Sequence, residues 1–248
     1  MPSNANTIFQ RRKLLAAGAA LAGAASSAAL AQSGLPFSGS AAQGQGGLPT
    51  AGKGPSTADI KPYEELANPV AEDARKVLTI FSFSCPYCRQ HHNGIAGWAM
   101  GLPEKWLEHV WVPAVVDKDS MIAATAFFAA KQRVAGSPPR IAARSLAEWM
   151  SRAYDLVQES KEMADPKRAV NAWTDLVGES INPALHKNSV MVAATRVARY
   201  KITNTPSMVM GGRYVINPEI VNGRQDMFLQ LASGTASMVL SGLGYRGK

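Results

Sequence analysis

The feature that most constrains this chain is a pair of cysteines, Cys85 and Cys88, placed directly after an apolar run. They are the two cysteines that the sequence contains. Residues 76–83 (KVLTIFSF) are apolar and partly β-branched, which predicts a buried strand. Two intervening residues on a helical turn bring the sulfur atoms close enough to bond. The chain is therefore expected to pass from a core strand into a helix at Cys85.

The first cysteine lies at the start of a predicted helix that runs to about Met100. Unpaired N–H groups and the positive end of the helix dipole stabilise a thiolate at that position. Pro86 suits the first helical position because it has no N–H. We therefore expect Cys85 to be the exposed nucleophile with a low pKa, and Cys88 to be its buried resolving partner.

Three other uses of the cysteine pair are weaker. A structural disulfide that closes so short a loop removes little entropy from the unfolded chain. A structural zinc site usually draws on two separated pairs of ligands, and only His91 and His92 are near. Haem attachment needs a histidine directly after the second cysteine, where Arg89 stands. We expect no metal, and no cofactor beyond the redox-active disulfide Cys85–Cys88.

The four histidines form no pattern of a ligand set or of a Ser/His/Asp catalytic group. They are His91, His92, His109 and His186. We expect each of them to be a surface or capping residue.

The first 31 residues predict a cleaved export signal. A basic start is followed by an apolar, Ala-rich run over residues 14–31, and Ala29 and Ala31 are the small residues that precede a cleavage site. A transmembrane anchor is the alternative, weakened by glycines and serines within the run. Arg11 and Arg12, followed by two leucines at 14 and 15, resemble the twin-arginine motif, with a general secretory signal as the other possibility. Either route places the mature protein in the periplasm.

Residues 32–58 are rich in Gly, Ser, Ala and Gln without apolar periodicity, and predict a flexible tether. Without the three basic residues of the signal, the formal net charge falls from +8 to +5. No dense basic tract with interleaved aromatic residues occurs, so we expect no nucleic-acid binding. A modest cationic surface suits anionic lipid headgroups or acidic partners.

The order of the predicted elements indicates an α/β fold. Strands are predicted at 61–67, 76–83, 109–116, 207–210 and 213–216, and Pro113 indicates a bulge or an edge position in the third. Helices are predicted from about 86 to 100, from 119 or 120 to 134, and at 141–158, 166–177, 189–200 and 224–240. This order predicts a thioredoxin fold whose core spans 59–118 and 188–248, with an inserted helical domain over 119–187.

Thr205 and Pro206 form the second part of the predicted site. A proline directly before the predicted strand 207–210 stands where this fold places a cis proline facing the disulfide. The backbone of Thr205 is then available to pair with a substrate chain as an added strand. With Pro86 and Tyr87, these two residues are the candidate substrate-binding residues.

On these motifs the chain resembles the DsbA family of bacterial periplasmic thiol:disulfide oxidoreductases, from about residue 61 to 240. The resemblance rests on Tyr63-Glu64-Glu65-Leu66, Phe81-Ser82-Phe83-Ser84-Cys85-Pro86-Tyr87-Cys88, Thr205-Pro206-Ser207-Met208 and Gly212-Arg213-Tyr214. It implies donation of disulfides to unfolded or newly exported proteins with free thiols. It also implies reoxidation by a quinone-linked membrane partner of the DsbB type.

Two departures from the family pattern change this expectation. Tyr87 stands where DsbA has a histidine, which predicts a milder oxidant. Thr79 stands where the archetype buries an acidic residue, so a proton relay there is in doubt. Cys-Pro-Tyr-Cys also resembles a DsbG- or DsbC-like isomerase or reductase, although residues 33–57 are too short and polar for the dimerisation domain of that class. A periplasmic holdase or assembly factor without redox turnover is the non-enzymatic alternative.

Overall fold

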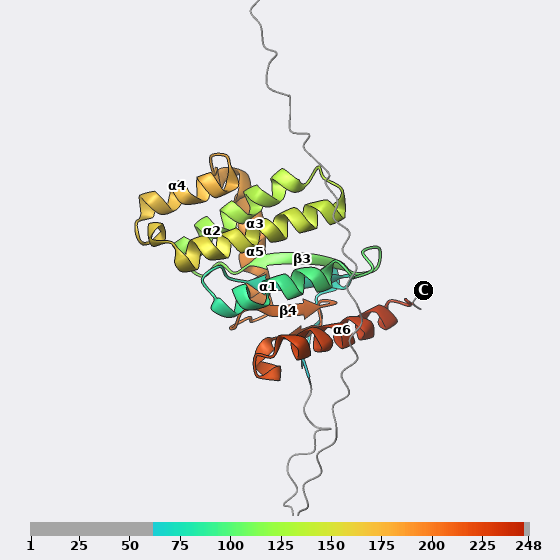
Figure 1. Cartoon of the computed structure of the whole chain (residues 1–248). Helices are drawn as coiled ribbons and strands as arrows, with labels where there is room; N and C mark the ends of the chain where they lie inside the picture. The colour runs from blue at the N-terminus through green and yellow to red at the C-terminus, as the bar shows by residue number, and fades with distance from the viewer. Residues whose placement is uncertain (1–61, 246–248) are drawn as a thin grey trace, which may run out of the picture. The chain divides into compact units, whose positions relative to one another are not determined.

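A computed structural model describes residues 62–245, and a five-stranded sheet lies at its centre (Figure 1). The predicted signal (1–31) and tether (32–58) lie outside the described residues. The strands are β1 (Glu64–Glu65), β2 (Lys76–Phe81), β3 (Glu108–Pro113), β4 (Ser207–Met210) and β5 (Tyr214–Ile216), in the spatial order β1-β5-β4-β2-β3. β2 and β3 are parallel and the other neighbours antiparallel. Pro113 ends β3 at the sheet edge, as its sequence predicted.

Within residues 62–245, six α-helices and three short 3₁₀ segments surround the sheet. They are α1 (Pro86–Ala99), α2 (Lys118–Val134), α3 (Pro139–Glu159), α4 (Pro166–Val177), α5 (Pro183–Arg199), α6 (Gln225–Gly242), η2 (Ala71–Asp73), η3 (Lys161–Ala164) and η4 (Pro218–Val221).

The predicted start of α5 at residue 189 was wrong. Pro183 is the first residue of the helix rather than a break before it, and the side chain of Asn182 caps the helix by accepting from the N–H of Ala184. The predicted boundary between insertion and second core part, at 187 and 188, therefore falls inside α5.

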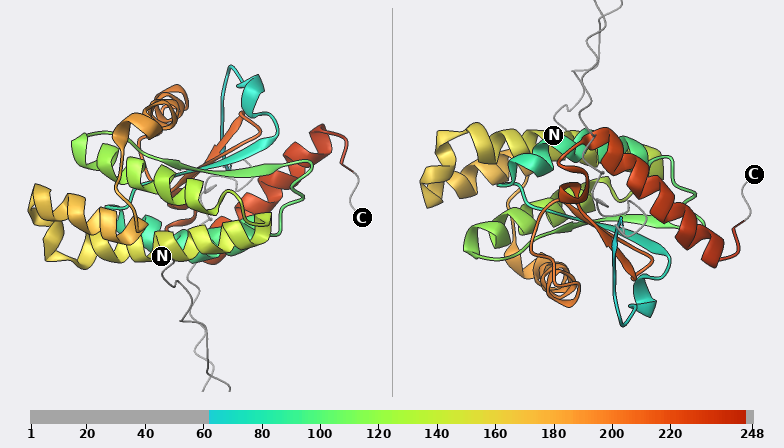
Figure 2. Two further views of the ribbon diagram at one scale, coloured as in Figure 1. Left: turned by 90° about the horizontal axis from the view of Figure 1, so that it is seen from above. Right: turned by 90° about the horizontal axis from the view of Figure 1, so that it is seen from below.

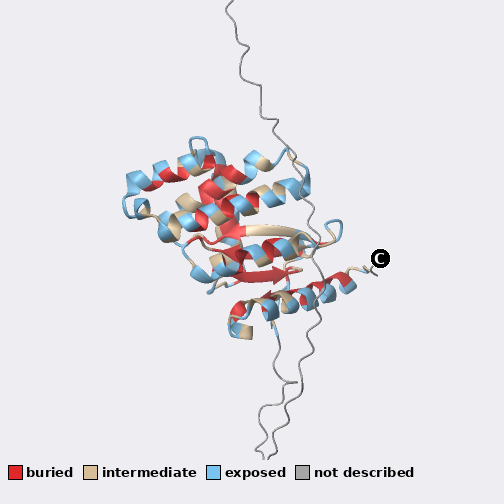
Figure 3. Ribbon diagram, viewed as in Figure 1, coloured by how far each residue is buried: buried red, intermediate tan, exposed pale blue. Residues whose placement is uncertain are grey.

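The alternating side chains of β2 divide the core between two faces of the sheet. Val77 packs with Ile95 of α1 and Phe228 of α6 on one face. Leu78 and Ile80 pack on the other face, which α5 covers. Figure 2 shows α6 and α5 on opposite sides of the sheet. Burial follows this layering, since β4 is buried along its whole length while the outer faces of the helices are exposed (Figure 3).

Helices α2, α3 and α4 form a helical block that packs beside α1 and β3 (Figure 1). Its core is aromatic, with Trp149 and Tyr154 from α3 and Trp173 from α4. Phe83, from the loop that precedes the cysteines, enters this core, and its ring centroid lies 5.0 Å from that of Tyr154. The loop that carries Cys85 is thereby held by the helical block as well as by the sheet.

The β4–β5 hairpin turns at Gly211 and Gly212, as the sequence predicted. Both residues have positive φ, 60° and 62°. A Cβ atom at Gly212 would lie 2.2 Å from the carbonyl oxygen of Val70. Only glycine therefore permits this turn and the close approach of the chain before β2.

A buried carboxylate ties η2 to α5. Asp73 is fully buried and accepts hydrogen bonds from Lys76 (2.9 Å), Arg196 (2.9 Å) and the Tyr200 hydroxyl (2.7 Å). Burial by itself raises the pKa of Asp73, but these hydrogen bonds and the two positive charges outweigh it and lower the pKa overall. Among residues 62–245, no helix is both long and apolar enough to cross a membrane.

Candidate active site at Cys85 and Cys88

The two cysteines lie where β2 ends and α1 begins. Cys85 is the N-cap of α1, with extended backbone angles (φ −85°, ψ 117°), and Pro86 is the first helical residue. The N–H of Cys85 donates to the carbonyl of Ser82 (3.2 Å), which closes a tight turn between strand and helix. This geometry agrees with the expectation that the chain passes from a core strand into a helix at Cys85.

The Cys85 thiol has a pKa lowered from 9.0 to about 5. The largest cause is a hydrogen bond from the Cys88 thiol. Partial burial opposes the shift, while a hydrogen bond from the Thr205 side chain and the backbone N–H groups of Cys88 and Tyr87 favour the thiolate. Cys85 is therefore a thiolate at neutral pH, and the stabilising groups come from the first turn of α1 and from Thr205.

Cys88 has the opposite environment. Its side chain is 1 % exposed and packs in the aromatic core formed by the helical block. Its pKa is raised above the usual range, and burial is the largest cause. The hydrogen bond to Cys85 and the repulsion between the two thiolates also raise it. Its Sγ accepts from the N–H of Ser82 (3.4 Å). One accessible thiolate therefore lies beside one protonated, inaccessible thiol.

The chain brings Thr205 and Pro206 against this pair from 120 positions away. The Thr205–Pro206 peptide bond is cis, as expected. Cys85 Sγ lies 3.0 Å from the carbonyl oxygen of Thr205. A cavity of about 330 Å³ begins there, with Tyr87 on its wall, 59 % exposed. Four of the six predicted site residues (Tyr87, Thr205, Pro206 and Cys85) thus meet at or beside this cavity, with Pro86 and Cys88 in the adjoining turn of α1.

Sequence reasoning missed Gln158 of α3. Its side-chain amide donates to the carbonyl oxygens of both Phe83 (2.7 Å) and Cys85 (3.1 Å). The helical block thereby fixes the backbone of the active-site loop. A glutamine near the end of a predicted helix carries no local signal for this role, because the contact joins residues more than 70 positions apart.

Arg89, next to Cys88, forms ion pairs with the helical block. Its guanidinium donates to Asp155 (2.7 Å) and Glu159 (2.5 Å) of α3. These bonds hold α1 against α3. They also pair the positive charge that is nearest to the cysteines in sequence with two carboxylates of α3. The low pKa of Cys85 accordingly has local hydrogen bonds, and no arginine or lysine, among its main causes.

The expectation for the histidines was wrong at three positions. His91, His92 and His186 are buried, and His109 is half-buried. α1 lies between α6 and α3, so neighbouring residues on it are both covered: His91 packs on Phe228 and His92 on Tyr154. Burial lowers the pKa of both His91 and His92, which favours neutral imidazoles.

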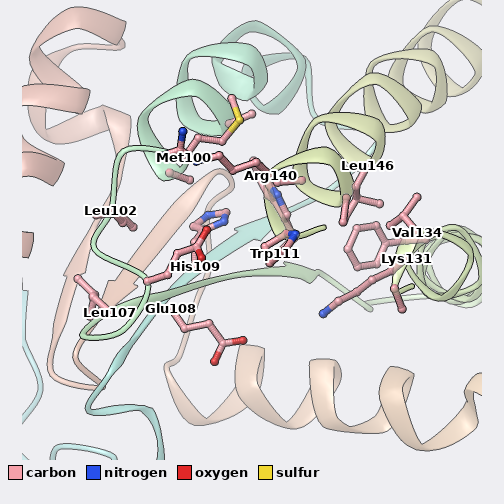
Figure 4. Close-up of a pocket in the computed structure, with 18 residues that line it drawn as sticks. Met100, Leu102, Leu107, Glu108, His109, Trp111, Lys131, Val134, Arg140 and Leu146 are labelled. Carbon is pink, nitrogen blue, oxygen red and sulfur yellow. The ribbon is translucent and has the colours of Figure 1, made fainter. Parts of the chain in front are cut away.

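A second cavity, of about 360 Å³, lies at the other end of α1 (Figure 4). The C-terminal end of α1, β3 and the facing ends of α2 and α3 line it, and His109, Trp111 and Leu146 are on its walls. His109 Nε2 lies 2.9 Å from the hydroxyl of Thr79. Neither cysteine lines this cavity. Residues 62–245 contain no group of three or more metal-ligating side chains.

Comparisons with known proteins agree with this architecture. No family model matches the sequence, and no curated relative matches it. Among solved structures, DsbA from Pseudomonas aeruginosa is similar with a TM-score of 0.60 and 19 % identity, over 74 % of this chain and 95 % of that chain. NmDsbA1 from N. meningitidis gives 0.60 and 17 %, over 74 % and 94 %. DsbA from Proteus mirabilis gives 0.56 and 18 %, over 75 % and 100 %. At these identities the likeness establishes the fold, and the chain has the DsbA fold, a thioredoxin core with a helical insertion.

Proposed function

We propose that this protein is an exported thiol:disulfide oxidoreductase that forms disulfide bonds in newly exported proteins. The observation that carries the proposal is the contrast within one turn of helix: the pKa of Cys85 is lowered to about 5, while burial raises that of Cys88. An accessible thiolate beside a protected thiol is the arrangement of disulfide-exchange enzymes. The likeness to DsbA structures supports the same activity.

The reaction begins with the oxidised pair. A substrate thiolate attacks the Sγ of Cys85, the Cys85–Cys88 bond breaks, and Cys88 leaves as a thiolate that takes up a proton. A second thiolate of the same substrate then attacks the substrate sulfur of the mixed disulfide, and Cys85 leaves as a thiolate. The substrate gains one disulfide, and two electrons pass to the cysteine pair. Cys85 is the better leaving group because of its low pKa.

The stabilised thiolate sets the direction of exchange. A low Cys85 pKa stabilises the reduced form, so the disulfide form oxidises other thiols. A value of about 5 lies between about 3.5 for DsbA and about 7 for thioredoxin. With Tyr87 in place of a histidine, we expect a reduction potential between about −120 mV and about −270 mV.

Substrate binding uses the residues across from the cysteines. Thr205, whose carbonyl oxygen lies 3.0 Å from Cys85 Sγ, offers its backbone for pairing with an extended chain. Pro206 and Tyr87 line the adjoining cavity. The substrates are unfolded or newly exported proteins with free thiols, met in the periplasm after removal of the signal at residues 1–31. A quinone-linked membrane protein of the DsbB type reoxidises the pair.

Thiol trapping in cells tests the direction. We expect acid-quenched, alkylated extracts to contain mostly the oxidised Cys85–Cys88 pair. A mostly reduced pair would contradict the oxidase and favour an isomerase or reductase. A Cys85→Ser, Cys88→Ser double variant that still fulfils the cellular role would instead favour a holdase.

A further inference from the structure

The cavity beside Cys85 is lined mostly by residues with polar side chains, and one of them is charged. Its described lining residues are Tyr87, Asn204, Thr205, Pro206, Asn217, Pro218, Glu219, Asn222 and Gly223. Among these, Glu219 is the charged side chain, and no lysine or arginine is present. Thr205 joins the cavity to the redox centre, since its carbonyl oxygen lies 3.0 Å from Cys85 Sγ. A substrate residue next to the reacting cysteine would therefore meet a negative surface.

The Glu219 carboxylate is held in place yet remains available. Asn217 caps η4 by accepting from the N–H of Glu219 (3.0 Å), which fixes the backbone. The side-chain amide of Asn204 donates to Glu219 Oε2 (2.9 Å), which orients the carboxylate. Within residues 62–245, no cationic side chain forms an ion pair with Glu219, and the residue is exposed. Its Oε1 atom can accept hydrogen bonds from a ligand.

Tyr87 supplies an aromatic surface to the same cavity. It is 59 % exposed despite its size. The chain comes close to its ring at Gly223, where a Cβ atom would lie 4.0 Å from Tyr87 Cε1. Arg224, the cation next to Gly223 in sequence, donates to Asp226 (2.9 Å) and does not line the cavity. The cavity therefore combines a carboxylate and an exposed ring with no competing cation among its described lining residues.

We propose that this cavity binds an arginine or lysine side chain that flanks the reacting cysteine of a substrate protein, an inference that rests on the proposed oxidoreductase function. A guanidinium forms charge-assisted hydrogen bonds with a carboxylate oxygen and stacks on a tyrosine ring. A volume of about 330 Å³ lies at the lower end of the range for ligand sites, which suits one side chain. Basic residues beside the cysteine then favour formation of the mixed disulfide with Cys85.

A single-turnover experiment with the full-length oxidised protein tests this subsite. The substrates are dithiol peptides that differ at one residue next to the first cysteine: arginine, its neutral isostere citrulline, or glutamate. The protein's own disulfide is the oxidant, so each turnover transfers two electrons and needs no other reagent. We expect the arginine peptide to react about fivefold faster than the citrulline peptide, the size typical of an exposed ion pair with an aromatic neighbour. The glutamate peptide should be slowest.

Two variants separate the subsite from general electrostatics. Glu219→Gln should remove the difference between arginine and citrulline. Glu179→Gln makes the same charge change at an exposed position in the loop before α5, away from the cavity, and should keep the difference. The preference of the wild-type protein should fall as salt is added, because exposed charges are screened.

The outcomes distinguish this inference from the function on which it rests. Equal rates for the arginine and citrulline peptides overturn the subsite while leaving dithiol oxidation intact. A preference that survives in Glu219→Gln, or that Glu179→Gln also removes, overturns the assignment to Glu219. Failure to oxidise any of the three peptides overturns the proposed function and this inference with it.

Discussion

The two cavities at the ends of α1 differ in size, in lining and in the charge that they favour. The cavity at the N-terminal end is smaller, is lined mostly by residues with polar side chains, and lies next to Cys85. The cavity at the C-terminal end is larger and mainly apolar, with His109 on its wall (Figure 4). A helix of 14 residues separates them by about 20 Å. The larger cavity is therefore remote from both cysteines, and cavity volume does not mark the candidate site.

The same comparison holds for the titratable groups. At the N-terminal end, hydrogen bonds led by that from Cys88 lower the pKa of Cys85 to about 5 and favour a negative charge. At the other end, burial and then the charge of Lys131 lower the pKa of His109 to about 3 and exclude a positive charge. At neutral pH the environment at one end of α1 favours the Cys85 thiolate, and the environment at the other end favours neutral His109.

The largest expected effect concerns the cysteines themselves. Cys85→Ser should abolish dithiol oxidation, and Cys88→Ser should accumulate mixed disulfides with substrates because the resolving thiol is missing. Arg140→Ala, at the exposed rim of the other cavity, should leave oxidation unchanged. Rates with a reduced peptide and non-reducing gels measure both effects. Alkylation of the reduced protein should label Cys85 first, with half-maximal rate near pH 5. Labelling of Cys88 first would reverse the assigned roles.

The second prediction concerns stability at the other end of α1. The folded-state pKa of His109, about 3, lies below its unfolded value of about 6.5. The unfolded chain therefore binds the proton first, and the stability associated with neutral His109 is lost as pH falls from about 6.5 toward 3. This loss can reach about 1.4 kcal/mol per pH unit. In His109→Gln, urea unfolding should show a smaller loss between about pH 7 and pH 4 than in the wild type. An equal loss of stability in both proteins would mean that His109 takes up its proton as readily in the folded protein as in the unfolded chain.

Both ends of α1 show what a sequence can predict. The position of Cys85 at a helix start, with a proline after it, is a local feature of the backbone that the motif predicts. Pro206 was found because its position before a strand fits the fold. The contacts of Gln158 and Glu219 were missed, because each is a tertiary hydrogen bond that no neighbouring residue signals. His91 and His92 were misplaced for a related reason: a helix covered on two sides buries polar residues that its own sequence does not mark.

The third prediction concerns residue 87, at the N-terminal end. Tyr87→His places an imidazole beside the active-site turn, where its positive charge would stabilise the thiolate. If the imidazole stabilises the thiolate by about 1.4 kcal/mol, the Cys85 pKa should fall by about one unit. The reduction potential should rise by about 30 mV at the same time. Equilibration with a glutathione buffer measures the potential. A wild-type potential at or above about −120 mV would show that another group sets the redox poise.

The smallest expected effect tests whether the helical block tunes the redox centre or merely covers it. Gln158 is bonded to the carbonyl oxygen of Cys85 and touches no sulfur, so it acts by positioning the N-cap under the N–H groups of α1. Gln158→Ala removes two hydrogen bonds, each worth about 1 kcal/mol, and part of this loss should fall on the thiolate. The Cys85 pKa should rise by about half a unit, and the reduction potential should fall with it. The absorbance of the thiolate, recorded as the pH is varied, measures this pKa. Gln132→Ala, at an exposed position on α2, is the matched control and should change neither quantity. Lower stability with an unchanged Cys85 pKa would limit Gln158 to a structural role, and the low pKa would then depend on the first turn of α1 and Thr205 without the helical block.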